Sequence, residues 1–353
     1  DYTYDDYGNI TTIITDMFQI RYHYDSLNRL IREDNEPLQK TTTFQYDSNG
    51  NRIRKKEYPF TLKEQLLDCS LIETYQYDKN QLISIKNQTK TSTPTTQEIK
   101  YSENDKFYGY PIQYKGYTLT WNKHKELESF GNIQYKYNEQ GIRISKTIGT
   151  ITTEYVVDGT KILSSIANDG KTFYFHYAVD KLIGFKYNNN EYIYRRNIQG
   201  DITHIYTKEG LLVAEYQYDA WGNCNIINYS DDDIGNLNPF RYRGYFFDTE
   251  TQLYYLNSRY YDSKTGRFIS PDVLSILDET MTQINGLNLY MYCGNNPINK
   301  YDPTGHFPWL ILAAAVLLFT PVGGIVFQAA TSILSYAVMS IWALGDLVFN
   351  GGK

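Results

Sequence analysis

The sequence predicts an all-β protein, a long antiparallel β-ribbon wound into a shell or solenoid, with a helical hydrophobic C-terminal tail. The 353 residues include 36 Tyr, 16 Phe and 4 Trp, and aromatic side chains suit half-buried pleated surfaces. A Tyr-Asp turn phrase also recurs along the chain. At the other end, Asp346 is the only charged residue between Phe307 and Phe349. Together these three observations set the fold class.

The repeated phrase consists of an alternating run, Tyr-Asp or Tyr-Asn, a few turn residues, and a second alternating run. An Asp side chain accepts hydrogen bonds from backbone amides two residues on, and a following Gly or Asn tolerates positive φ, so the phrase closes a turn. Because a lone hairpin is marginally stable, consecutive hairpins are expected to share one sheet from residue 1 to about 245. The copies begin at Tyr24, Tyr46, Tyr77, Tyr137 and Tyr218.

The spacing of the copies matches one hairpin per unit. Tyr4, Tyr24 and Tyr46 lie 20 and 22 residues apart, which accommodates two short strands and two turns. This regularity disfavours an ordinary β-sandwich with tyrosines placed by chance. The chain opens inside the pattern, at Asp1–Asp5, without an initiator Met, so we expect that it was cut from a longer protein.

Composition argues against several classes of function. The formal charge is −6, from 34 basic and 40 acidic side chains, and no segment gathers a basic stripe, so nucleic acid is not expected as a partner. Cys69, Cys224 and Cys293 are far apart and fit neither a disulfide framework nor a metal site. We therefore expect no metal and no cofactor.

Residues 236–306 carry a denser series of motifs. In order and spacing, the series resembles the repeat-associated core of bacterial Rhs/YD-repeat proteins, whose shells are related to those of toxin-complex C components and teneurins. The resemblance implies a YD-repeat shell at 1–235 (the C-terminal part of a longer shell), the core at 236–306, and a tail at 307–353. The motifs are Asn238–Tyr245, Tyr254–Asp262, Gly266–Asp272, Gly286–Tyr292, Asn295–Pro297 and Tyr301–His306.

By this resemblance, the shell encloses a variable C-terminal toxin and is plugged by the core. In several members the core cuts the chain just after its terminal Asp-Pro-x-Gly-x phrase, which here places the cut between His306 and Phe307; many relatives carry Leu at the position of His306. Expected partners are the chain's own toxin region and an immunity protein or secretion machinery, and the expected location is secreted or cell-surface. The cleavage-site residues would be Asp302, Pro303, Gly305, His306 and Phe307.

The residues that match the cleavage chemistry are Arg259 and Asp272. A carboxylate at Asp272 could activate water, and a guanidinium at Arg259 could steady the oxyanion or orient the carboxylate. Asp262 is a candidate second carboxylate for autoproteolysis of the aspartic-protease type. The structural alternatives stay open: Arg259 and Asp272 as an ion pair that pins the plug, and Asp262 and Asp302 as turn residues.

The tail fits three roles. Trp309–Phe327 is 19 residues without a charge, long enough to cross a bilayer as a helix, although Thr320–Gly324 would kink or break it. A second apolar run, Ala329–Leu344, follows. The tail could insert into a membrane with contact through residues 309–345, pack inside the shell as a helical hairpin, or serve as a simple anchor. It could also be the start of a variable toxin region.

The leading functional hypothesis is therefore a shell that encapsulates and delivers a C-terminal toxin and cleaves itself after His306. The alternative is a cell-surface or cell-wall-associated adhesion protein without catalytic activity, whose exposed tyrosines bind carbohydrate or a partner surface. A third hypothesis is a degenerate shell that no longer cuts itself.

Overall fold

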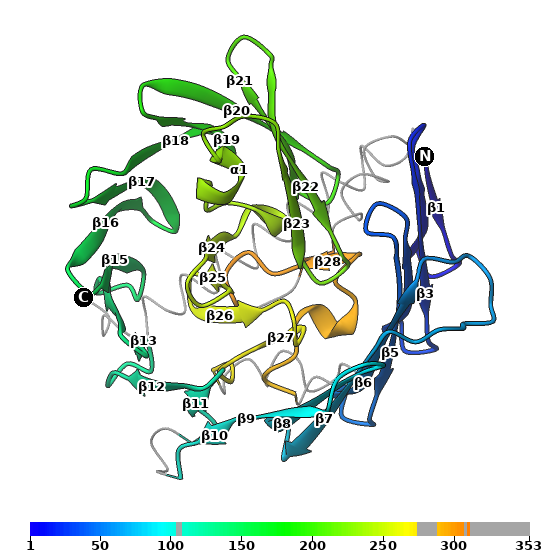
Figure 1. The fold of residues 1–353 in the computed structure, drawn as a ribbon. Coiled ribbons are helices and arrows are strands. Elements are labelled where there is room, and N and C mark those ends of the chain that lie inside the picture. The colour runs from blue at the N-terminus through cyan, green and yellow to red at the C-terminus, as the bar shows by residue number, and fades with distance from the viewer. Residues whose placement is uncertain (104–107, 274–287, 307–308, 311–353) are drawn as a thin grey trace, which may run out of the picture. The chain divides into compact units, whose positions relative to one another are not determined.

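The computed structural model describes residues 1–103, 108–273, 288–306 and 309–310. The chain divides into two compact units, Asp1–Trp309 and Leu310–Lys353. Nearly all regular structure described in the first unit is antiparallel β-strand, in sheets whose strands follow chain order (Figure 1). The predicted antiparallel arrangement of consecutive hairpins is confirmed, but the single sheet expected from residue 1 to about 245 is divided into two, and the second ends at Asn228.

The first sheet contains nine strands, each paired with its neighbours in sequence. Such a meander needs only short turns, which is what the repeated phrase supplies. Its strands are β1 (Tyr2–Tyr4), β2 (Ile10–Ile14), β3 (Gln19–Tyr24), β4 (Leu30–Asn35), β5 (Lys40–Tyr46), β6 (Arg52–Pro59), β7 (Leu71–Asp78), β8 (Gln81–Thr89) and β9 (Thr95–Glu98).

The second sheet continues the meander through fourteen strands. They are β10 (Lys100–Tyr101), β11 (Pro111–Tyr114), β12 (Tyr117–Trp121), β13 (Leu127–Phe130), β14 (Ile133–Tyr137), β15 (Arg143–Ile148), β16 (Ile151–Asp158), β17 (Lys161–Ala167), β18 (Thr172–Ala178), β19 (Lys181–Tyr187), β20 (Asn190–Arg196), β21 (Ile202–Thr207), β22 (Leu212–Tyr218) and β23 (Cys224–Asn228).

Residues after β23 form a separate small sheet around which the ribbon curves in Figure 1. We call the described residues 236–273 and 288–306 the core segment. It contains a four-stranded sheet, β24 to β27. The remaining elements are α1 (Ile234–Leu237), η2 (Tyr242–Gly244), β24 (Phe246–Asp248), β25 (Leu253–Leu256), β26 (Arg259–Asp262), β27 (Arg267–Phe268), η3 (Cys293–Asn295), β28 (Lys300–Tyr301) and β29 (Trp309–Leu310).

The repeated phrase closes its turns through the Asp or Asn side chain. In the turn between β3 and β4, Asp25 Oδ1 accepts the amides of Leu27 and Arg29, at 2.9 Å each. The amide of Asn28, at φ 58°, donates to the Asp25 carbonyl at 2.9 Å. The side chain thus satisfies amides that the tight turn leaves without a strand partner. The same two side-chain contacts occur at Asp5, Asp47, Asn138 and Asp219.

Three turns depart from the pattern read from the sequence. Asp78 faces Gln81 across a two-residue turn in which Lys79 and Asn80 both have positive φ, the geometry of a type I′ hairpin turn. Conversely, Asn122 and Asn197 accept the amides two and four residues on as the predicted copies do. These two copies were missed because Trp121 and Arg196 precede them instead of Tyr.

The repeat tyrosines tie each hairpin to the one before it. Each phenol donates to the carbonyl of the residue that lies five positions after the Asp or Asn of the preceding turn. Because a buried phenol needs a hydrogen-bond partner, this link fixes the spacing of consecutive units. The pairs are Tyr24 to Ile10 (2.7 Å), Tyr46 to Leu30 (2.7 Å), Tyr77 to Arg52 (2.8 Å), Tyr137 to Leu127 (2.8 Å) and Tyr218 to Ile202 (2.8 Å).

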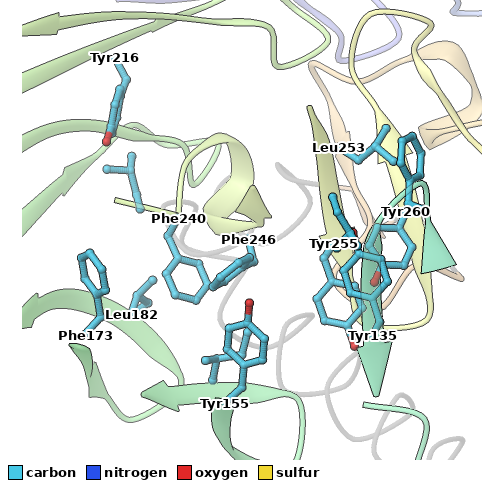
Figure 2. Close-up of a cluster of buried hydrophobic side chains, with 14 of the residues drawn as sticks. Tyr135, Tyr155, Phe173, Leu182, Tyr216, Phe240, Phe246, Leu253, Tyr255 and Tyr260 are labelled. Carbon is cyan, nitrogen blue, oxygen red and sulfur yellow. The ribbon is translucent and has the colours of Figure 1, made fainter. Parts of the chain in front are cut away.

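The main hydrophobic core lies between the second sheet and the core segment. Figure 2 shows Phe240 and Phe246 facing rings from the surrounding strands. Phe240 packs edge-on against Phe175, with ring centroids 4.8 Å apart, and Phe246 packs edge-on against Tyr155 at 5.5 Å. The ribbon therefore buries its inner face by wrapping a folded core segment.

The ends of the ribbon also meet. The side-chain amide of Asn35 in β4 donates to the Tyr218 carbonyl of β22 at 2.9 Å, and the ring of Phe44 in β5 packs edge-on against Trp221, 5.7 Å between centroids. Contacts between residues so distant in sequence bring the end of the second sheet back to the first. The ribbon thus makes a closed turn.

The predicted membrane helix is not found among the described residues, where no helix is long and apolar enough to cross a bilayer. The run at Trp309–Phe327 starts with strand β29 instead of a helix. Residues 311–353, and with them the rest of the predicted helical tail, lie outside the described residues.

A buried carboxyl lies where the two ends of the ribbon meet. Glu33 in β4 is 1% exposed, and its Oε1 accepts the Asn35 side-chain amide at 2.9 Å. Burial, reinforced by the negative charge of Asp219, raises the pKa of Glu33 to about 8. Because its ordinary value is 4.5, the folded chain binds a proton here that the unfolded chain releases between these two values.

We therefore expect the stability contributed by Glu33 to be complete below pH 4.5 and to be lost as pH rises toward about 8. Glu33→Gln should remove this loss, so that the variant unfolds at a higher temperature than the wild type at pH 8.5 while the gap closes at pH 4.5. Thermal midpoints across the pH range measure it. An unchanged pH profile in the variant contradicts the assignment; Glu139→Gln, on an exposed turn, is the control.

Candidate functional site

The candidate site forms where β26, the residues after β27, and the loop after β28 come together. Arg259 begins β26, Asp272 follows β27, and Asp302 follows β28. All three side chains are buried. The tertiary fold brings these three side chains together, because no two of them share a strand or turn.

Arg259 is the centre of the site. Its Nη2 lies 2.7 Å from Asp272 Oδ2 and 3.7 Å from Asp302 Oδ2. Its Nη1 donates to the Leu289 carbonyl at 2.9 Å, and its Nε donates to the Gly305 carbonyl. The guanidinium thus links two carboxylates and holds the backbone carbonyl directly before His306.

The guanidinium also has an aromatic support. Its central carbon lies 3.5 Å from the ring centroid of Phe268 in β27, a cation–π contact that fixes the plane of the group. Burial lowers the pKa of Arg259, and the negative charges of Asp272 and Asp302 oppose that shift.

Asp272 contacts the predicted cleavage residue directly. Its Oδ1 lies 2.6 Å from His306 Nδ1 and accepts the Val273 amide at 2.8 Å. Its Oδ2 faces Arg259. The His306 side chain is 38% exposed, so solvent can reach this edge of the site.

Asp302 shapes the loop that carries His306. Its Oδ1 accepts the amides of Thr304 at 3.2 Å, Gly305 at 2.8 Å and His306 at 3.1 Å. Burial raises the pKa of Asp302, while Arg259 and the loop amides oppose the shift. The Asp-Pro-Thr-Gly phrase is thus a side-chain-closed turn, as the sequence predicts for this position, and it places a second carboxyl beside Arg259.

The β25–β26 turn also clamps the loop that carries His306. Ser258 Oγ donates to the Thr304 carbonyl at 2.8 Å, and the Asn257 side-chain amide donates to the Pro303 carbonyl at 3.2 Å. These two contacts were not read from the sequence. The Ser-Arg-Tyr-Tyr motif gave a signal for Arg259 alone.

Asp262 lies apart from these groups. It accepts the Tyr114 phenol at 2.8 Å, and its Oδ2 lies 3.0 Å from Lys115 Nζ. Successive side chains of a strand point to opposite faces, and the three-residue separation from Arg259 puts Asp262 on the other face of β26. Asp302 is instead the second carboxylate that the fold brings to Arg259 and Asp272.

The core segment that carries the site is attached to turns of the ribbon. The phenols of Tyr242, Tyr261 and Tyr254 donate to three consecutive carbonyls in the Asp219 turn, those of Ala220 (2.9 Å), Trp221 (2.8 Å) and Gly222 (2.8 Å). The Asn299 side chain accepts the Ile10 amide at 2.9 Å, and that of Asn295 donates to Gly50 at 2.7 Å. The turns therefore position the site.

The carboxyls of the candidate site can activate water, and its guanidinium can stabilise a tetrahedral oxyanion. Phe307, the other side of the predicted cut, lies outside the described residues. In the part of the chain that the structure describes, no three His, Cys, Asp or Glu side chains are grouped to hold a metal ion.

Comparison with known proteins agrees with the fold. The teneurin YD-shell family model matches residues 160–298. The tRNA3(Ser)-specific nuclease WapA of Bacillus spizizenii is 32% identical over 302 residues, 82% of this chain. This chain belongs to the YD-repeat shell family. It spans only 12% of the length of that WapA protein.

Two further relatives extend the comparison. Salivary gland surface protein 1 of Aedes aegypti is 31% identical over 167 residues, 47% of this chain and 4% of that protein. The structure of the Photorhabdus luminescens Tc holotoxin pore matches 88% of this chain and 18% of its own chain, with a TM-score of 0.57 and 18% sequence identity. The second likeness supports the YD-shell fold.

Gly305 tests how tightly the loop is held. It has φ +83°, and a Cβ there would lie 2.5 Å from both the Leu256 carbonyl oxygen and Ser258 Oγ. Gly305→Ala should displace the loop, so that amides 304–306 exchange with solvent at least about tenfold faster. Hydrogen–deuterium exchange measures this. Gly159→Ala is the control, since Gly159 also has positive φ but nothing within 4 Å of its Cβ position. If Gly159→Ala speeds amide exchange in its own turn as much as Gly305→Ala does in the 304–306 loop, the loop is not held by Leu256 and Ser258.

Proposed function

We propose that this chain is part of a YD shell that encloses and delivers a toxin carried on its C-terminal side and cuts itself after His306. The observation that carries the cleavage proposal is the linkage of Arg259 to Asp272, Asp302 and the Gly305 carbonyl. That linkage lies one residue from the proposed scissile bond. The parts of the proposed protein are the repeat shell at 1–235, the core at 236–306 and the tail at 307–353.

The proposed chemistry is hydrolysis of one peptide bond. Water attacks the His306 carbonyl carbon while Asp272 takes the water proton. Arg259 holds the preceding carbonyl and provides positive charge for the oxyanion. When the bond to the Phe307 nitrogen breaks, that nitrogen receives the proton, leaving a carboxylic acid and an amine.

Asp302 has two proposed roles in this reaction. Through its three amide contacts it holds His306 in place. Its Oδ2, 3.7 Å from Arg259 Nη2, also brings a second carboxyl to the guanidinium that binds Asp272, and two such acids would serve autoproteolysis of the aspartic-protease type. Asp262, bonded to Tyr114 and Lys115, is assigned no step.

The relatives support the delivery part of the proposal. WapA is named a tRNA nuclease, and the structural relative is named a Tc holotoxin pore. We propose that the toxin of this protein likewise resides outside the matched region, with an immunity protein or secretion machinery as further partners. We place the shell outside the producing cell, secreted or at its surface, and propose membrane contact through residues 309–345.

The second candidate function is a cell-surface or cell-wall adhesion protein. It is favoured by the name of the Aedes aegypti relative, a salivary gland surface protein, and by exposed aromatic side chains such as Tyr7 (79%) and Tyr174 (50%). Such a protein would bind glycan or cells and remain in one piece. A self-cleaved chain therefore favours the toxin-delivering shell, and an intact chain that binds glycan or cells favours the adhesion protein.

Intact-mass spectrometry of the purified chain tests cleavage. The wild type should yield a fragment that ends at His306. Asp272→Asn and Arg259→Lys should remain whole, with cleavage slowed by about 100-fold or more because the base or the bound carbonyl is lost. Asp302→Asn should slow cleavage as well.

Asp262→Asn is the matched control, because it alters a buried carboxylate of the same strand that lies outside the site. Circular dichroism of every variant checks that the shell remains folded. A wild type that stays whole at every pH tested, or an Asp272→Asn chain that is cut as fast as the wild type, contradicts the proposal.

His306 should slow its own cleavage. Its imidazole occupies Asp272 Oδ1, the oxygen that would otherwise bind the attacking water. His306→Leu should therefore speed cleavage by about fivefold, the factor that matches one hydrogen bond of about 1 kcal/mol. Time courses of fragment release give the rates, with the exposed His124→Leu as control; a His306→Leu chain that cleaves no faster than the wild type refutes this role.

A further inference from the structure

Arg52 and Arg267 bring two buried positive charges to one small cavity. Arg52 begins β6 of the ribbon and is 4% exposed; Arg267 begins β27 of the core segment and is 6% exposed. Both line a cavity of about 10 Å³ together with Tyr77, Gly266 and Met291. The cavity thus lies at the junction of the ribbon and the core segment.

The two arginines are linked through Gly266 and Tyr77. Arg52 Nη2 packs against Gly266, where an added Cβ would lie only 2.2 Å from it, and Gly266 directly precedes Arg267. The central carbon of Arg267 lies 4.9 Å from the ring centroid of Tyr77, whose phenol donates to the Arg52 carbonyl. One positive charge from the ribbon and one from the core segment therefore belong to residues that line the same cavity.

Neither group has a carboxylate partner within the described residues. Arg52 donates from Nη1 to the Lys264 carbonyl at 3.4 Å, and Arg267 donates from Nη2 to the Asn80 carbonyl at 2.5 Å. Buried Arg52 Nε and Nη2 have no hydrogen-bond partner there. Removing two cations from water without a counter-charge is costly.

The neighbouring amides do not supply acceptors to Arg52. Asn51 Oδ1 accepts the Asn288 side-chain amide at 2.9 Å, and the Gly50 carbonyl accepts that of Asn295 at 2.7 Å. Aromatic rings cover the Arg52 guanidinium on its faces, with Phe44 at 4.7 Å and Trp221 at 4.0 Å. Its unpartnered N–H groups therefore call for an acceptor within the cavity.

We propose that this cavity binds a monatomic anion, chloride under ordinary conditions, that bridges Arg52 and Arg267. A negative ion turns a like-charge contact between ribbon and core segment into an attractive one. A cavity of about 10 Å³ has room for one small particle; of the common anions a halide comes nearest to that size, whereas sulfate, phosphate and carboxylate groups are several atoms across. Water alone would fill the space without balancing the charge.

The position of Arg52 in the repeat supports a specific role. It occupies the fifth position after the turn residue Asp47, where other repeats carry Ile10, Leu30, Leu127 or Ile202. An apolar residue is therefore compatible with the fold at this position. This supplies a variant, Arg52→Leu, that should fold without the anion.

Thermal unfolding of the full chain tests the site. We compare sodium chloride, bromide, gluconate and sulfate at equal ionic strength. Chloride and bromide should raise the unfolding midpoint by about 2 °C or more over gluconate, saturating with concentration as expected for one bound ion. At low salt concentrations, the unfolding midpoint in sulfate should be no higher than the midpoint in gluconate.

Arg52→Leu and, separately, Arg267→Met should abolish the halide dependence, while Arg195→Leu, on an exposed strand position, should keep it. Bromide-soaked crystals of the wild type should show an anomalous peak between Arg52 and Arg267, which is independent of variant folding. The proposal is overturned if the unfolding midpoints in chloride and gluconate are equal, or if Arg52→Leu keeps the halide effect. It is also overturned if sulfate stabilises the chain more than chloride does, or if the bromide-soaked cavity shows no anomalous peak and holds only water.

Discussion

The hydrogen bonds from turn amides to an Asp or Asn side chain are the interaction on which the rest of the structure depends. At Asp219 the carboxylate accepts the amides of Trp221 and Asn223, and the tight turn leaves the three carbonyls of residues 220–222 available to other donors. Those carbonyls then accept tyrosine phenols from the core segment. One side chain thus both closes a hairpin and creates the surface on which the core segment docks.

The need to satisfy carbonyls near the turns also explains the unusual tyrosine content. A tyrosine ring fills the half-buried inner face, while its hydroxyl ties one hairpin to the preceding one, as Tyr46 does with the Leu30 carbonyl. Where two repeats carry Arg in place of the apolar residue, aromatic rings of the ribbon, and at Arg143 also of the core segment, surround the guanidinium group. Arg143 lies among five of them and pairs with Asp248 at 2.5 Å. Arg52 stacks on Trp221 without a carboxylate among the described residues.

The candidate site follows from this docking. Arg259, Asp272 and Asp302 come from three parts of the core segment that meet when it folds on itself, and its bonds to the ribbon turns hold it in place. Arg259 and Asp272 were predicted from motif resemblance, and the structure pairs them at 2.7 Å. Asp302 was predicted as part of the cleavage turn, and its approach to Arg259 could not be read, since a turn motif is local and carries no information on its distant neighbours. Whether these groups cut the chain stays a proposal.

The sequence by itself determined the antiparallel ribbon, because the turn phrase and the strand alternation act over a few residues and are written directly in the chain. It also located the core motifs. The tertiary structure alone decided which carboxylates share Arg259. Face alternation in β26 sends Asp262 to Tyr114, and the return of the ribbon end brings Arg52 beside Gly266. Such contacts join residues 148 to more than 200 positions apart, and nothing in local propensity encodes a pairing at that separation.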